Sequence, residues 1–159
     1  MTTYDTLPDT ARVWIYQSDR PFKEEDIPEI RQELQHFARG WVSHNKQLRA
    51  HAEVLHNRFL VLMVDEGQAG ASGCSIDSSV YFLKQMQAKY GVNLFDRMSF
   101  SYQQEDKVYT VHREEFARLY QEGQINDDTM VFDTLVNTKG ALENSWLKPL
   151  AKSWHHRMV

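Results

Sequence analysis

The chain has 159 residues, of which 42% are hydrophobic and 25% are charged, as expected of one soluble globular domain with its own core. This composition excludes collagen-like, intrinsically disordered and disulfide-framework proteins. The formal net charge of −4 argues against a general nucleic-acid binder, because neutralising phosphates requires an excess of basic residues.

The two ends and the cysteine content predict a cellular compartment. Segment 1–10 is polar and acidic, without the cationic and apolar stretches of a signal peptide, and we expect it to be flexible. The longest apolar run, residues 59–64, is far shorter than the roughly 20 residues that span a bilayer. Cys74 is the single cysteine, so no intrachain disulfide can form. These features predict a cytoplasmic protein without a membrane span.

The first elements are a strand and a helix. Four consecutive β-formers at 13–16 predict a strand that is covered on both faces. Asp26 and Glu29 then form a capping-box-like pattern at the start of a helix. One face of that helix carries apolar residues at helical spacing, namely Ile27, Ile30, Leu34, Phe37, Ala38 and Trp41.

A hairpin and a second helix follow. Residues 48–54 alternate apolar and polar side chains, which predicts a half-buried strand, and residues 59–64 predict a strand buried on both faces. The short connection 56–58 makes the two an antiparallel hairpin. After a glycine-containing loop, a helix is expected over residues 76–90, with Ile76, Val80, Leu83 and Met86 inward and Gly91 just past its end.

The remaining elements complete an α+β pattern. We expect a hairpin of strands 98–102 and 108–111, a helix over 114–122, an edge strand at 129–132 and a last helix over 138–146. The first six elements match the split β-α-β arrangement of ferredoxin-like folds. We therefore predict one domain, 1–159, with an antiparallel sheet and helices mainly on one face. Its core spans 11–103, and a C-terminal extension, 104–159, packs on that core.

Several segments resemble known sequences. Residues 60–66 have the form of a Walker B strand, and 72–75 faintly resemble an ABC-transporter signature. The segments VWIYQSDRPF, VDEGQAGASGCSIDSSV, GVNLFDRMSFSY and SWHHR resemble an uncharacterised bacterial family whose members sometimes carry the label ABC transporter ATPase. The resemblance covers most of residues 12–157 and implies no established reaction.

The residues argue against ATP hydrolysis. A phosphate-binding loop needs the pattern G-x-x-x-x-G-K-[ST], whose amides and lysine hold the phosphates. The sequence contains no such segment, and the first lysine after the glycine-containing loop is Lys84, inside the predicted helix. An ABC signature also precedes Walker B, whereas the similar segment here follows it.

The glycine- and serine-rich loop 67–75 is the strongest candidate site. Glycines allow a backbone to approach a ligand closely, and free amides at a helix start attract anions. The alternative is that a crowded passage from strand to helix needs small residues and serine caps. We predict a site for a small anionic ligand formed by Gly70, Ser72, Gly73, Cys74, Ser75 and Ser78.

Cys74 has two interpretations. A helix N-terminus favours the thiolate, so Cys74 is a candidate catalytic nucleophile. A base would have to reach it through folding, since no histidine is near in sequence. The alternative is a buried, inert cysteine. We therefore favour a binding or interaction protein over an enzyme that uses Cys74.

No cofactor or metal is predicted. Asp65, Glu66 and Asp77 supply carboxylates, but their spacing fits no calcium loop and equally suits solvated turns. The histidines are scattered without a zinc-binding pattern.

The C-terminal part indicates an interaction role. Trp146, Trp154, His155 and His156 are interleaved with basic residues, so this tail either docks on the core or binds a partner. Residues 99–146 are also weakly similar to GYF-like peptide-binding modules, although the Gly-Tyr-Phe triplet is absent. A protein partner is therefore possible, while the oligomeric state stays open.

Overall fold

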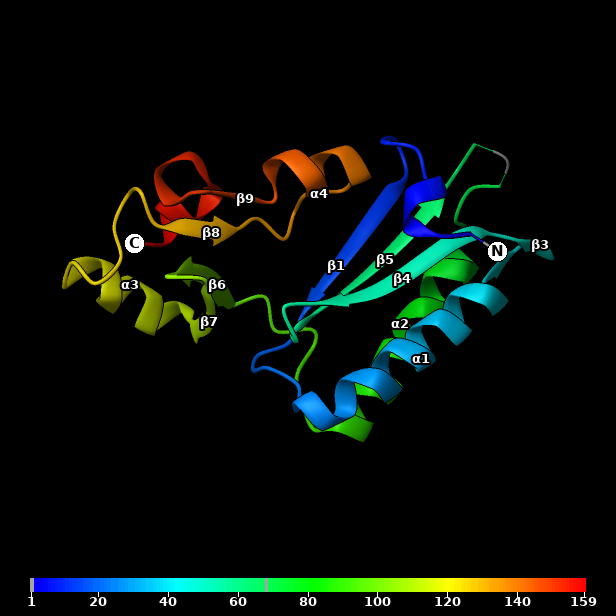
Figure 1. Cartoon of the computed structure of the whole chain (residues 1–159), viewed down its shortest axis with the longest axis horizontal. Coiled ribbons are helices and arrows are strands. Elements are labelled where there is room, and N and C mark those ends of the chain that lie inside the picture. The colour runs from blue at the N-terminus through cyan, green and yellow to red at the C-terminus, as the bar shows by residue number, and fades with distance from the viewer. Residues whose placement is uncertain (1, 68) are drawn as a thin grey trace.

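A computed structural model describes residues 2–67 and 69–159 and has an α+β fold with two main antiparallel sheets (Figure 1). The first sheet has the strand order β1-β5-β4 and the second the order β7-β6-β8-β9. The strands of the first sheet are β1 (Arg12–Gln17), β4 (Arg49–Leu55) and β5 (Phe59–Asp65). The predicted α+β class is thereby confirmed, with two sheets in place of one.

The central strand β5 explains the layering around the first sheet. Its side chains alternate between two cores because successive residues of a strand point to opposite faces. Leu60, Leu62 and Val64 join the cluster formed with the first two helices, α1 (Ile27–Gly40) and α2 (Gly73–Tyr90). On the other face, Phe59, Val61 and Met63 pack against residues of the C-terminal part. The prediction of a strand buried on both faces is confirmed for β5.

Helix α1 presents the predicted apolar face but begins differently. Ile27, Ile30, Leu34 and Ala38 are buried, as the spacing predicts. Asp26 makes no side-chain cap, however, because it closes a 3-10 turn, Glu24–Asp26, and has helical rather than extended backbone angles (φ −88°, ψ −15°). The expected capping box is therefore wrong. Instead, the 3-10 turn leads directly into the helix.

Helix α2 starts three residues earlier than predicted, and in its first two turns a different face is buried than the predicted one. Its buried residues are Ser75, Ser79, Leu83 and Met86, while Ile76 and Val80 are only half-buried. The small serines face inward because the Trp41 indole lies against the first turn, where its Nε1 donates to the Ser75 carbonyl oxygen at 2.8 Å. Gly91 ends the helix in a left-handed conformation (φ 65°), as predicted.

The second sheet contains the strand that the split β-α-β arrangement would place beside β1. That strand, β6 (Ser99–Gln104), pairs with β7 (Lys107–His112) and β8 (Met130–Phe132) instead. The first sheet thus has three strands of the predicted arrangement, and the four-stranded ferredoxin-like core is not formed. The other elements are β2 (Val42–Ser43), β3 (Lys46–Gln47), α3 (Arg113–Gln121), α4 (Lys139–Ser145) and β9 (Leu147–Pro149).

The described part of the N-terminal segment contacts the rest of the fold, and its flexibility stays a prediction. Residues Tyr4–Thr6 form a 3-10 turn, and Leu7 is buried. The buried Lys139 ammonium donates to the carbonyl oxygens of Tyr4 and Leu7 at 2.9 and 2.8 Å. Its positive charge also lies over the Tyr4 ring, 4.3 Å from the centroid.

Two sets of contacts join the sheets. An aromatic cluster places Phe59 of β5, Phe132 of β8 and Trp146 within 4.9–5.1 Å of one another, measured between ring centroids. A polar set begins at Gln17, whose Nε2 donates to the Ser99 carbonyl oxygen at 2.7 Å and whose Oε1 accepts from Ser101 Oγ at 2.7 Å. The C-terminal tail is therefore docked on the core. Among the described helices, none is long and apolar enough to cross a membrane.

Candidate functional site

The predicted loop site is organised by the protein's own carboxylates. Asp65 Oδ1 accepts from the Gly67 amide at 3.0 Å, and Glu66 Oε2 accepts from the Ala71 amide at 2.9 Å. A Cβ on Gly67 would lie 3.1 Å from Asp65 Oδ1, and one on Gly70 would lie 3.2 Å from Glu66 Oε2. These two glycines therefore allow the backbone to close on internal anions.

The serines of the same loop cap helix α2. Ser72 Oγ accepts from the Ser75 amide, and Ser75 Oγ accepts from the Ser72 amide at 2.6 Å, which completes a capping box. Ser78 Oγ donates back to the Ser75 carbonyl oxygen. Within the predicted site, no described residue bonds to the amides of Gly70, Gly73 and Cys74, so these three are available to an anion. The anion site stays a prediction with this reduced set of donors.

Cys74 is exposed rather than buried. Rotation of α2 turns Ser75 toward the core and leaves the neighbouring thiol in solvent. The interpretation of Cys74 as a small buried hydrophobe is therefore wrong. Its catalytic role stays a prediction, because no described residue forms a hydrogen bond with its sulfur.

We expect Cys74 to react completely with a maleimide in the native protein, because the residue is exposed. The measurement is the mass of the intact protein after brief exposure without denaturant, with Cys74→Ser as the unreactive control. Reaction only after adding urea would contradict the exposed position. Reaction that stays fast at mildly acidic pH would favour the nucleophile hypothesis, since it requires persistent thiolate.

A cleft lies elsewhere, between the two sheets and beside β1. Figure 1 shows β1 as the strand of the first sheet that faces the C-terminal half. The cleft has a volume of about 410 Å³, within the range of ligand-binding pockets. Its lining comes from four segments, namely residues 13–17 of β1, the connection 94–97 with Ser99, the connection 134–137, and Trp154 with Met158 of the tail.

The outer edge of β1 is bridged at its start, where Arg12 faces Thr138, and is unpaired farther along the cleft at Ile15. Val13 N–H donates to the Asn137 carbonyl oxygen at 2.9 Å, away from β5, whereas Ser18 N–H donates to Arg58 on the β5 side at 2.7 Å. Because backbone groups alternate in direction along an antiparallel strand, those of Ile15 also point away from β5. No described residue bonds to the Ile15 N–H or C=O. The cleft thus contains a free sheet edge where a fourth strand is missing.

Asp133 fixes the opposite rim of the cleft. Its Oδ1 accepts from the Leu135 amide at 2.9 Å and from Trp154 Nε1 at 2.8 Å, while Lys148 Nζ lies 2.7 Å from Oδ2. Burial opposes ionisation, but these donors and the Lys148 charge lower the pKa of Asp133 below its usual range. The Trp154 wall is therefore fixed before any ligand arrives, which reduces the entropy cost of binding.

One exposed and several partly buried apolar side chains line this cleft. Leu135 is 62% exposed on the rim. Trp14, Tyr16 and Phe95 are only partly buried, and the Tyr16 and Phe95 rings meet edge to face with centroids 5.6 Å apart. Such side chains can cover the apolar side of a bound chain.

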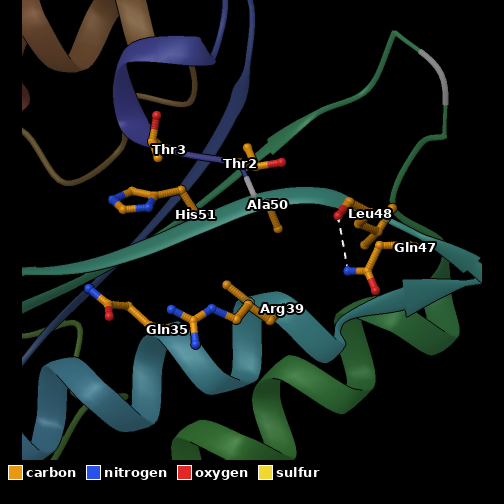
Figure 2. A pocket seen from close by; sticks show the side chains of 9 residues that line it. Thr2, Thr3, Gln35, Arg39, Gln47, Leu48, Ala50 and His51 are labelled. Atoms are coloured by element: carbon orange, nitrogen blue, oxygen red, sulfur yellow. Dashed lines mark hydrogen bonds between the residues drawn. The ribbon is translucent and has the colours of Figure 1, made fainter.

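A second cavity of about 410 Å³ lies at the other edge of the first sheet. Figure 2 shows it between helix α1, which contributes Gln35 and Arg39, and strand β4, with Thr2 and Thr3 of the N-terminal segment on one side. His51 projects from β4 toward Thr3, and burial lowers its pKa. The N-terminal segment already covers part of this edge, which distinguishes it from the β1 edge.

Sequence reasoning missed the β1 cleft. Its residues come from four separate segments, and a bare edge strand has the same apolar run as a covered one. The tail was identified as an interaction element, and Trp154 does line the cleft. Within residues 2–67 and 69–159, no group of three or more His, Cys, Asp or Glu side chains could hold a metal ion.

Comparison of the chain with protein-family models, curated proteins and solved structures finds no match.

Proposed function

We propose that this protein binds an extended segment of another polypeptide at the edge of β1. The observation that carries the proposal is the unpaired Ile15 N–H and C=O inside a cleft with aromatic walls. A segment that adds to a sheet edge gains main-chain hydrogen bonds, while pockets beside the edge select its side chains. The edge from Val13 to Gln17 spans about 13 Å at a strand rise of about 3.3 Å per residue. The Val13 N–H at one end already donates to Asn137, which leaves a short stretch around Ile15 for an added strand.

This proposal keeps the interaction role expected from the sequence and moves it from the glycine-containing loop to the cleft. It is supported by the internal hydrogen bonds of the Gly67, Ala71 and Ser72 amides and by the fixed rim at Asp133. An enzyme that uses Cys74 remains the rival, tested by the maleimide experiment.

A panel of short acetylated and amidated peptides with alternating valine and threonine tests the proposal. We expect bound peptide to shift the amide resonance of Ile15 and slow its hydrogen exchange. The amides of Trp14 and Tyr16 already face β5 and should change little. Ala52 is the internal control, since its backbone faces outward at the β4 edge, outside the cleft.

A pair of variants tests the apolar rim in the same assay. Leu135→Ser should weaken peptide binding about tenfold, because burying a leucine side chain contributes on the order of 1.5–3 kcal/mol. Tyr81→Ser removes a comparably exposed side chain from α2, outside the cleft, and should leave affinity unchanged. Protection of Ile15 in the protein alone would contradict the proposal, because it would indicate that two β1 edges pair in a dimer.

A further inference from the structure

The charged groups of the cleft indicate what kind of segment fits. Only two charged side chains line it, Asp96 and Arg97. Both oxygens of Asp96 are used within its own turn, since Oδ1 accepts from the Met98 amide at 2.8 Å and Oδ2 from Ser99 Oγ at 2.9 Å. Asp96 is therefore already satisfied.

Arg97 has no such partner. No described residue forms a hydrogen bond or an ion pair with its guanidinium, and the exposed Arg97 lines the cleft together with Tyr16. Burial raises the pKa of Tyr16, and the positive charge of Arg97 opposes that rise, so the two groups are close enough to interact electrostatically. The guanidinium thus supplies an uncompensated positive charge beside the free edge of β1.

We infer that the bound segment is acidic, with a carboxylate side chain opposite Arg97 and apolar side chains against the aromatic walls. This inference rests on the proposed function, because the backbone pairing places the carboxylate. A planar guanidinium can bind a carboxylate through two parallel hydrogen bonds, which gives charge selection together with orientation. The partner is therefore an otherwise apolar, extended protein segment that contains aspartate or glutamate.

The test uses the alternating peptides with aspartate, asparagine or lysine at one position scanned along the chain. For the parent protein at low salt, we expect the best aspartate peptide to bind about fivefold more tightly than its asparagine counterpart. Arg97→Gln should remove that preference, and Arg97→Glu should reverse it in favour of lysine. Lys84→Gln makes the same charge change at an exposed position of α2, outside the cleft, and should retain the preference for aspartate over asparagine.

The Ile15 amide distinguishes the two ways of failing. Equal protection of Ile15 by the aspartate and asparagine peptides would overturn the acidic preference while leaving the edge-binding function intact. A preference that survives Arg97→Gln would also overturn it, since another group would then select the charge. Absence of Ile15 protection with every peptide would overturn the proposed function and this inference together.

Discussion

Replacing Phe132 by alanine is expected to lower the free energy of unfolding by about 3–5 kcal/mol, the usual cost of emptying a buried phenylalanine site. Phe132 is 1% exposed on β8 and contacts Phe59 of β5 and Trp146. The cavity would open where the two sheets meet, so both sheets would lose packing. We therefore expect a large loss of stability without separation of the sheets.

Urea unfolding followed by tryptophan fluorescence and by far-ultraviolet circular dichroism measures this effect. The two signals should give one coincident transition in the parent and in the variant, as for a single cooperative unit. Phe132→Leu is the matched control and should cost about 1 kcal/mol, because it retains most of the apolar volume. Two separate transitions would show that each sheet folds alone and would refute the role assigned to the cluster.

Local periodicity predicted most elements because it is set by neighbouring residues. The alternation over 48–54 and the apolar run over 59–64 gave the β4–β5 hairpin, which the structure confirms. Strand β9 was not predicted. Its Pro149 lies in an edge strand, where a missing N–H removes no ladder bond.

Pairing between distant strands could not be predicted from such patterns. The segment that became β6 has the same alternation whether it joins β1 or β8. Its choice of β8 leaves the β1 edge open and creates the cleft. The candidate cleft therefore depends on which strand β6 pairs with, and the local sequence of β6 does not determine this pairing.

The glycine-containing loop shows a different limit. Its glycines predicted close approach of the backbone to a ligand, whereas the groups that approach Gly67 and Gly70 are carboxylates of the chain itself. Asp65 and Glu66 directly precede the loop, and their carboxylates accept from its amides. The adjacent acidic pair was thus a usable signal for an internally satisfied loop.

The buried histidine of the C-terminal tail links stability to pH. His155 is 1% exposed, and burial, the largest effect, lowers its pKa from 6.5 to about 4. The Asp133 carboxylate opposes this shift and the Lys148 ammonium adds to it. Between pH 4 and 6.5 the folded state therefore binds fewer protons than the unfolded state. The contribution of neutral His155 to the stability of the folded state is fully present above pH 6.5 and is lost as the pH falls toward 4.

As the pH falls through that window, we expect protonation of His155 to lower the free energy of unfolding by up to about 3 kcal/mol, at about 1.4 kcal/mol per pKa unit. Urea unfolding of His155→Asn should give a shallower pH dependence than the parent, because asparagine can keep a hydrogen bond to Ser153 without titrating. The variant also loses packing of the imidazole ring. This loss is the same at every pH, so it lowers the free energy of unfolding without changing its dependence on pH. Burial opposes ionisation of Asp133, but its donors and the Lys148 charge lower its pKa, which moves its protonation to lower pH. Parallel curves for the parent and His155→Asn would show that protonation of His155 is not what destabilises the fold in acid.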